Sequence, residues 1–122
     1  MYLKSYKDLT VWQKSIGLVK KVYELTSGFP KDETYGLSNQ MRRAAVSIPS
    51  NIAEGYLRKN RKEFLQFLRI SYGSSAELET QLIIGEELYP NIKSQAANAL
   101  LEEIQKMLNV LINKLENKPP VH

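Results

Sequence analysis

The residues best suited to chemistry in this sequence are four cations within five positions: Arg58, Lys59, Arg61 and Lys62. Guanidinium and ammonium groups bind phosphate oxygens, and a protein that neutralises several phosphates in this way binds nucleic acid without reading its bases. Short basic runs also occur on many proteins as ordinary solvated surface. The run therefore predicts a phosphate-binding surface only if the fold gathers further cations beside it.

Catalytic chemistry finds little support in the sequence. The single histidine is His122, the last residue, and there is no Gly-rich phosphate loop or nucleophile motif. Without an interior histidine, the Glu-x-x-His metal motif of helical bundles cannot occur. Glu77 and Glu79 are close in sequence, but a separation of two directs them to different faces of a helix. We therefore expect no enzymatic activity, no metal and no cofactor.

The composition is that of one small basic domain. The chain has 122 residues, a formal net charge of +4 and no cysteine, which excludes disulfides and thiolate metal sites. The first residues lack the apolar core of a secretory signal, and no apolar run approaches the roughly 20 residues of a membrane span. We expect a single domain over residues 1–122, located in the cytoplasm and not in a membrane.

Apolar periodicity predicts four helices and no strand. Gly28 and Pro30 should end the first helix, and Asn60 with Glu63 forms a capping pair that should begin the third. The expected helices cover residues 8–27, 35–57, 61–88 and 94–117. Four long helices joined by short connections predict an all-α, up-down-up-down four-helix bundle.

Two overlapping apolar seams mark the expected first helix. The first consists of Trp12, Ile16, Val19, Tyr23 and Thr26, and the second of Val11, Ser15, Leu18, Val22 and Leu25. Spacings of four and three make each a packing seam. Two seams suit burial against the bundle on one side and against another subunit on the other, and they equally suit one wide core face. In either case we expect Trp12 to be a core or interface anchor rather than a base-stacking platform.

Pro49 lies in the middle of the expected second helix. Proline removes one helical hydrogen bond and crowds the carbonyl of Ala45, at a cost of about 3 kcal/mol. One interpretation is two short helices broken at Ile48. We expect instead one helix kinked at Pro49, because the apolar stripe keeps its phase from Met41 through Ile48 to Ile52.

The same helix offers further interface candidates. Val46, Pro49 and Ala53 form a second, smaller apolar patch, which one bundle does not need and which therefore favours oligomerisation. Arg42 and Arg43 lie beside this patch. We expect these arginines to pair with Glu77 or Glu79, across helices or across subunits, as structural or interface residues.

Longer motifs give a family resemblance. The segments are SYKDLTVWQKS at 5–15, YGLSNQMRRA at 35–44, RRAAVSIPSNIAEG at 42–55 and GSSAELETQL at 73–82. Together they resemble the bacterial four-helix-bundle proteins encoded within 23S rRNA intervening sequences (S23-type), over nearly the whole chain. The resemblance implies a homopentamer and a nucleic-acid role. The accessory proteins of diversity-generating retroelements, which partner a reverse transcriptase and RNA, are similar to the same bundle.

Bundle topology would concentrate cations at one end of the molecule. The junction of the second and third helices shares an end with both chain termini, so the basic run is joined by Lys4, Lys7, Lys114 and Lys118. Four carboxylates oppose these eight cations, which leaves a balance of about +4, whereas the other end has about −1. A ring of five parallel subunits would present roughly twenty positive charges on one face, a platform for phosphates.

We therefore expect a non-catalytic, oligomeric protein that binds nucleic acid through its basic end. RNA is favoured over DNA by the resemblance alone. The alternative is an oligomeric scaffold that docks a protein partner such as a reverse transcriptase. The acidic third helix and the second apolar patches suit that alternative.

Overall fold

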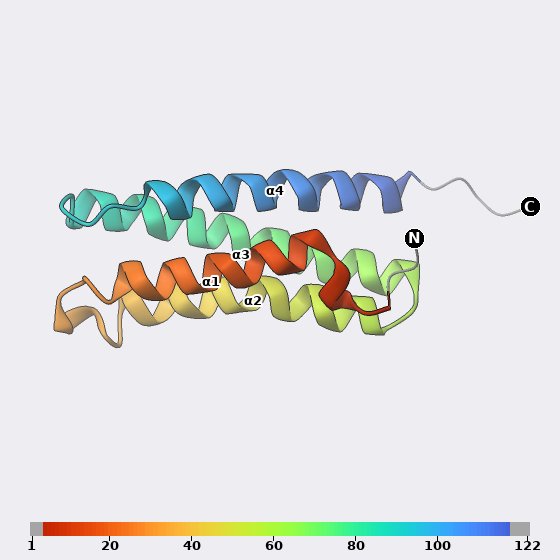
Figure 1. Ribbon diagram of the computed structural model, residues 1–122, viewed down its shortest axis with the longest axis horizontal. Coiled ribbons are helices and arrows are strands. Elements are labelled where there is room, and N and C mark those ends of the chain that lie inside the picture. Colours follow the sequence, from red (N-terminus) through yellow and green to blue (C-terminus); the bar gives the residue numbers. More distant parts are fainter. Residues whose placement is uncertain (1–3, 118–122) are drawn as a thin grey trace, which may run out of the picture.

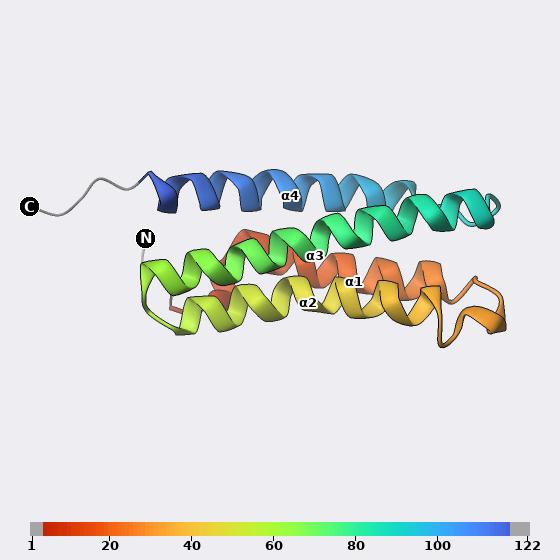
Figure 2. The same cartoon turned by 180° about the vertical axis from the view of Figure 1, so that it is seen from behind.

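The chain forms four long antiparallel helices in a computed structural model that describes residues 4–117 (Figures 1 and 2). The elements are a 3₁₀ turn η1 at Tyr6–Asp8, α1 at Thr10–Thr26, a 3₁₀ turn η2 at Lys31–Glu33, α2 at Leu37–Leu57, α3 at Arg61–Leu88 and α4 at Gln95–Glu116. Each helix packs against two others, so that α1 and α3 both contact α2 and α4. This arrangement confirms the predicted all-α four-helix bundle.

The first helix begins later than the predicted residue 8. Ser5 and Asp8 form a capping box of their own, in which the Ser5 Oγ accepts from the Lys7 N–H at 2.9 Å and the Asp8 Oδ2 accepts from the Ser5 N–H at 3.3 Å. This box closes the separate turn η1. Leu9 is then extended, with φ −73° and ψ 123°, so the α-helix begins at Thr10.

The other helix boundaries lie within two residues of the predicted ones. α3 covers the predicted range, and the Oδ1 of Asn60 accepts from the Glu63 N–H at 3.0 Å, as its capping position requires. α2 begins at Leu37 rather than at residue 35. The Oε1 of Glu33 accepts from the Leu37 N–H at 3.1 Å and so satisfies one of the free donors of the first turn.

The core contains only one of the two apolar seams of α1. Val11, Ser15, Leu18 and Val22 are buried, whereas Trp12, Ile16 and Val19 are half-buried and Tyr23 is exposed. The remaining core comes from one stripe on each of the other helices. Its fully buried members include Met41, Ile48, Ile52, Leu68, Leu78, Leu82, Leu101, Ile104 and Leu108. Apart from the buried Thr26, the first seam of α1 is thus left at least partly at the surface of the single chain.

The contact of α2 with α3 is the most extensive in the bundle, and it includes the residues of α2 just before Pro49. α2 is continuous through this proline, so the alternative of two helices broken at Ile48 is wrong. The buried Ser71 Oγ donates to the Ile48 carbonyl at 2.9 Å, and the hydroxyls of Ser47 and Ser74 lie 2.8 Å apart. Small serines on α3 therefore let the proline-containing part of α2 pack closely and hydrogen-bond with it.

The end of the bundle that contains the α1–α2 and α3–α4 connections is joined by two carboxylates. The Tyr89 hydroxyl donates to Glu33, which links the α1–α2 connection to the end of α3. The Oε1 of Glu86 accepts from the Ser94 hydroxyl at 2.5 Å and from the Asn98 amide at 2.6 Å, which links α3 to α4. These bonds tie the helix pairs together at this end of the bundle.

The glycines of α2 and α3 provide a test of the close packing. A Cβ at Gly55 would lie 2.6 Å from the Phe67 Cβ and 3.1 Å from Phe64, whereas a Cβ at Gly73 would have no neighbour within 4 Å. We expect Gly55→Ala to lower the free energy of unfolding by roughly 1–3 kcal/mol through overpacking. Gly73→Ala should raise it by roughly 0.5–1 kcal/mol through helix propensity. Urea denaturation of both variants measures this, and equal effects would contradict the close approach.

The carboxylates at the connection end predict a pH dependence of stability. The hydrogen bonds from Tyr89 and from the Leu37 N–H hold the pKa of Glu33 below its ordinary value of 4.5, and those from Ser94 and Asn98 lower the pKa of Glu86. Both pKa values are lower in the folded state, so the carboxylates contribute stability above about pH 4.5. That stability is lost as the pH falls through the folded-state values.

Thermal unfolding of Glu33→Gln and Glu86→Gln between about pH 7 and pH 3 checks this linkage. The difference from the wild type should be largest near pH 7 and should shrink at acid pH. Glu87→Gln is the control, since Glu87 is exposed and its side chain has no hydrogen bond or ion pair within residues 4–117. A constant difference across the pH range would contradict the linkage.

Candidate nucleic-acid interface

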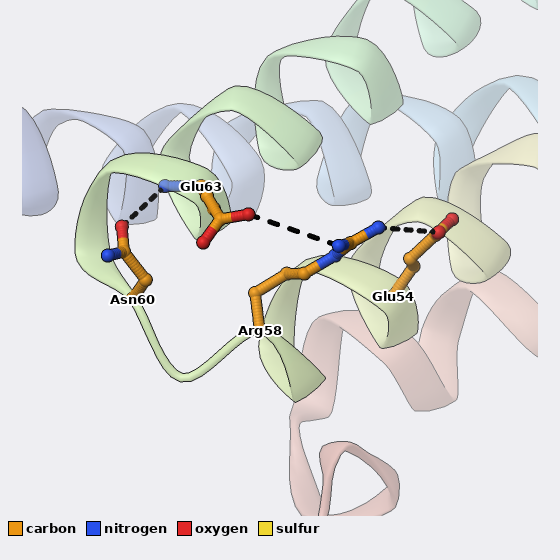
Figure 3. Close-up of polar contacts among 4 residues, drawn as sticks. All are labelled: Glu54, Arg58, Asn60 and Glu63. Atoms are coloured by element: carbon orange, nitrogen blue, oxygen red, sulfur yellow. Dashed lines mark hydrogen bonds and ion pairs between the residues drawn. The ribbon is translucent and has the colours of Figure 1, made fainter.

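The turn between α2 and α3 is organised by Arg58 (Figure 3). Its guanidinium NH2 lies 3.2 Å from Glu54 Oε1 on α2, and its NH1 lies 4.0 Å from Glu63 Oε1 on α3. The guanidinium also lies over the Phe67 ring, 5.1 Å from the centroid. Because two carboxylates and an aromatic face share this one cation, Arg58 fixes the turn and offers little free charge.

Arg61 holds the end of α4 to the start of α3. Its NH1 donates to the Leu115 carbonyl at 2.6 Å. The last carbonyls of a helix lack partners within the helix, and a cation there also suits the negative end of the helix dipole. Arg69 on α3 forms an ion pair with Glu116 one residue further along α4. Two arginines thus tie α3 to the end of α4.

The two lysines of the basic run are free. Lys59 and Lys62 are both exposed, and within residues 4–117 their amines form no ion pair or hydrogen bond. Lys59 has φ 54°, in the left-handed region, and it follows the C-cap residue Arg58. The basic run therefore divides into two arginines that stabilise the fold and two lysines that face solvent.

Further lysines lie at the same end of the bundle. The start of the described chain and the end of α4 both lie beside the α2–α3 turn, at the right of Figure 1. Lys4, Lys7 and Lys114 are exposed there. Lys118, the remaining residue expected at this surface, lies outside the described residues. We refer to Lys4, Lys7, Lys59, Lys62 and Lys114 as the lysine end.

Arg42 does not pair with Glu77 or Glu79 within the subunit, so the across-helix part of that prediction is wrong. The Arg42 Nε donates to Thr26 Oγ1 at 2.8 Å, and its guanidinium lies 4.5 Å from the centroid of the Tyr23 ring. The cause is its position on the α1 side of α2. Arg42 therefore joins the end of α1 to α2 and is a structural residue.

Arg43, Glu77 and Glu79 are also separated from one another. Arg43 and Glu77 line the same shallow hollow between α2 and α3, but among the described residues no ion pair joins them. Glu79 faces α4, where its Oε1 lies 3.5 Å from the Gln105 amide nitrogen. The two carboxylates lie on different faces of α3, as their spacing predicts, and they do not converge.

Trp12 and Pro49 lie on one apolar groove between α1 and α2. Trp12 packs edge-on against Tyr6, with ring centroids 5.3 Å apart. The groove has a volume of about 310 Å³, and its lining is Tyr6, Trp12, Ile16, Val19, Val46, Pro49, Ser50 and Ala53. Trp12 is half-buried there and Pro49 is buried. The first seam of α1 and the second patch of α2 are thus one continuous surface, which we call the α1–α2 groove.

Two other classes of site are absent from the part of the chain that the structure describes. No helix there is long and apolar enough to cross a membrane. Nor do three or more histidine, cysteine or acidic side chains gather there in a way that could hold a metal ion.

Sequence reasoning missed the roles of Arg61 and Arg69. Arg61 contacts Leu115, which is 54 residues away in sequence, and Arg69 contacts Glu116 at a separation of 47. Such contacts depend on how far the ends of α3 and α4 overlap, which periodicity does not fix. The pairing of Glu54 with Arg58 did have a signal, because a separation of four places opposite charges side by side on a helix.

Comparisons with known proteins agree with this architecture. A crystal structure of a protein with unknown function from the S23 ribosomal protein family of Bacteroides thetaiotaomicron VPI-5482 has the same fold, with a TM-score of 0.74 and 24% sequence identity. The match covers 84% of this chain and 98% of that one. No curated protein matches the sequence. The model of the family described as 23S rRNA-intervening sequence protein matches residues 7–113, so the chain belongs to this family.

Proposed function

We propose that this protein binds nucleic acid through the phosphate backbone at the lysine end, without catalysing a reaction. The proposal rests on the partners of the acidic side chains at that end, which are backbone N–H groups and arginines. Asp8 accepts from the Lys4 and Ser5 N–H groups, Glu54 and Glu63 hold Arg58, and Glu116 holds Arg69. Among residues 4–117, no carboxylate at that end pairs with a lysine amine, so the five lysines remain available to phosphates.

The opposite end of the bundle is a natural comparison surface. Lys20, Lys21 and Lys31 are exposed there as well. They lie among carboxylates, chiefly Glu24, Asp32, Glu33, Glu86 and Glu87, so the local field attracts anions less. If RNA were attracted only by the total charge of the protein, removing lysines from either end would weaken binding equally. If RNA binds at the lysine end, removing lysines there should weaken binding more.

RNA is the nucleic acid to test first, because the family is named for an rRNA element. Contacts from lysine amines to phosphates carry no base information. We therefore propose binding with little sequence selectivity, and with an affinity that falls steeply as salt is added.

We expect the triple variant Lys7→Gln, Lys62→Gln, Lys114→Gln to weaken RNA binding and to flatten its salt dependence. Each phosphate of single-stranded RNA that is no longer neutralised lowers the log–log slope by roughly 0.7, so three lower it by about 2. Fluorescence anisotropy across a salt series measures both quantities. The side chains are exposed and unpaired in the described part of the chain, so the fold should persist.

The matched control is Lys20→Gln, Lys21→Gln, Lys31→Gln, which removes the same charge from the opposite end. It should leave the salt slope close to that of the wild type. Equal losses in the two variants would mean diffuse attraction without a site. A wild-type protein that binds no RNA at low salt would refute the proposed function.

A second proposal concerns the α1–α2 groove, which we infer to be the contact surface between copies of this chain in an oligomer. Val46 is 40% exposed in the single chain, beside the half-buried Trp12. α3 presents apolar side chains of its own at Ile70, Ile83 and Ile84. A contact between two such different surfaces is heterologous, and its repetition gives a ring when the rotation between copies closes.

Light scattering tests this second proposal. The wild type should have a mass that is a multiple of 14.0 kDa. Val46→Asp, which places a charge in the groove, should lower that multiple. Val110→Asp is the control, because Val110 is 54% exposed on α4, away from the groove. A monomeric wild type would contradict self-association, and with it the alternative of an oligomeric scaffold that docks a partner protein such as a reverse transcriptase.

A further inference from the structure

Lys59 occupies a backbone position that suits glycine. Its φ is 54°, and no other non-glycine residue in the part of the chain that the structure describes has a positive φ. It follows Arg58, the last right-handed residue of α2, at the position where helices commonly end in a left-handed glycine. For a residue with a Cβ, this conformation crowds the following carbonyl oxygen. A lysine here therefore destabilises the fold relative to glycine.

Contacts on both sides of Lys59 accompany this conformation. Arg58 bridges Glu54 and Glu63 across the turn, and Asn60 must be extended, with φ −140°, to cap α3 (Figure 3). The Lys59 N–H donates to the Tyr56 carbonyl at 3.3 Å. Both neighbours of Lys59 thus have contacts of their own, and Lys59 joins them in the left-handed region. The strain belongs to the fold and not to a mobile loop.

The Lys59 side chain offers no structural compensation. It is exposed, and among residues 4–117 its amine forms no ion pair or hydrogen bond. Lys62, three residues on, lies in the first turn of α3, where the positive end of the helix dipole disfavours a cation. Lys59 and Lys62 thus both lower the stability of the fold, and both place an unpaired ammonium at the same turn. Strain kept at such a position points to function.

We propose that Lys59 is the principal phosphate contact of the lysine end, and that the turn trades folding stability for this contact. The inference rests on the proposed function and adds to it the residue on which binding depends most. The ligand chemistry is a phosphodiester of the nucleic-acid backbone. Free phosphate has the same oxygens but offers no second phosphate for Lys62 or Lys114, so it should compete only weakly.

The test compares Lys59→Gly with Lys59→Arg in the full chain. Lys59→Gly removes both the strain and the charge, so the midpoint of thermal unfolding should rise by a few degrees. The log–log salt slope for a single-stranded RNA of about 20 nucleotides should fall by roughly 0.7, and affinity near 0.1 M salt by about fivefold. Lys59→Arg keeps the strain and the charge and should leave both quantities unchanged. Inorganic phosphate serves as the competitor.

A Lys59→Gly variant that melts higher and binds RNA more weakly would support the inference. If Lys59→Gly melts higher but binds RNA with the wild-type affinity and slope, the strained lysine has no binding role and the inference is wrong. If Lys59→Gly melts lower, the premise of strain is wrong. If Lys62→Ala costs more affinity than Lys59→Gly, Lys59 is not the principal contact. In all three cases a wild type that binds RNA leaves the proposed function standing, whereas one that binds none removes both.

Discussion

The close packing of α2 against α3 is the most extensive contact of the bundle, and within it the buried Ser71 hydroxyl donates to the Ile48 carbonyl. Ile48 immediately precedes Pro49, where α2 loses a backbone donor. A large side chain at this point of α3 would hold the helices apart. Serines at 71 and 74 and the glycine at 55 instead allow contact along most of α2. This contact sets the relative position of α2 and α3, and hence the geometry of the turn that joins them.

At the α2–α3 turn, the arginines and the lysines of the basic run have different environments. The planar guanidinium of Arg58 contacts two carboxylates and the Phe67 ring, and that of Arg61 donates to the Leu115 carbonyl of α4. Both geometries suit a rigid fork with several donors. Lysine amines are compact and strongly hydrated, and here they remain in water. The fold thus uses the two arginines of the basic run in contacts of its own and leaves the two lysines exposed to solvent.

The fold was largely predictable from the sequence because its signals are local. The Asn60 cap fixed the start of α3, and the sustained apolar stripes fixed which faces are buried. The start of α1 was misplaced, although the spacing of Ser5 and Asp8 is itself a capping signal that explains the separate turn. The partners of Arg42 and Arg61 were not predictable from the sequence. They depend on how the helices are rotated and how far they are offset along their axes, and apolar periodicity does not determine either. Backbone strain at Lys59 likewise appears only when both helix ends are known.

The placement of the two ends of the described chain also has a mechanical consequence. α1 begins and α4 finishes at the same end of the bundle, and the two helices pack side by side in opposite directions (Figure 1). A tension applied between these ends would load the α1–α4 contacts one turn at a time, as in a zipper, rather than all together in shear. The ion pair between Lys14 and Glu103, 2.7 Å long, would be among the first links to open. Peeling would therefore need far less force than pulling the bundle apart along its axis.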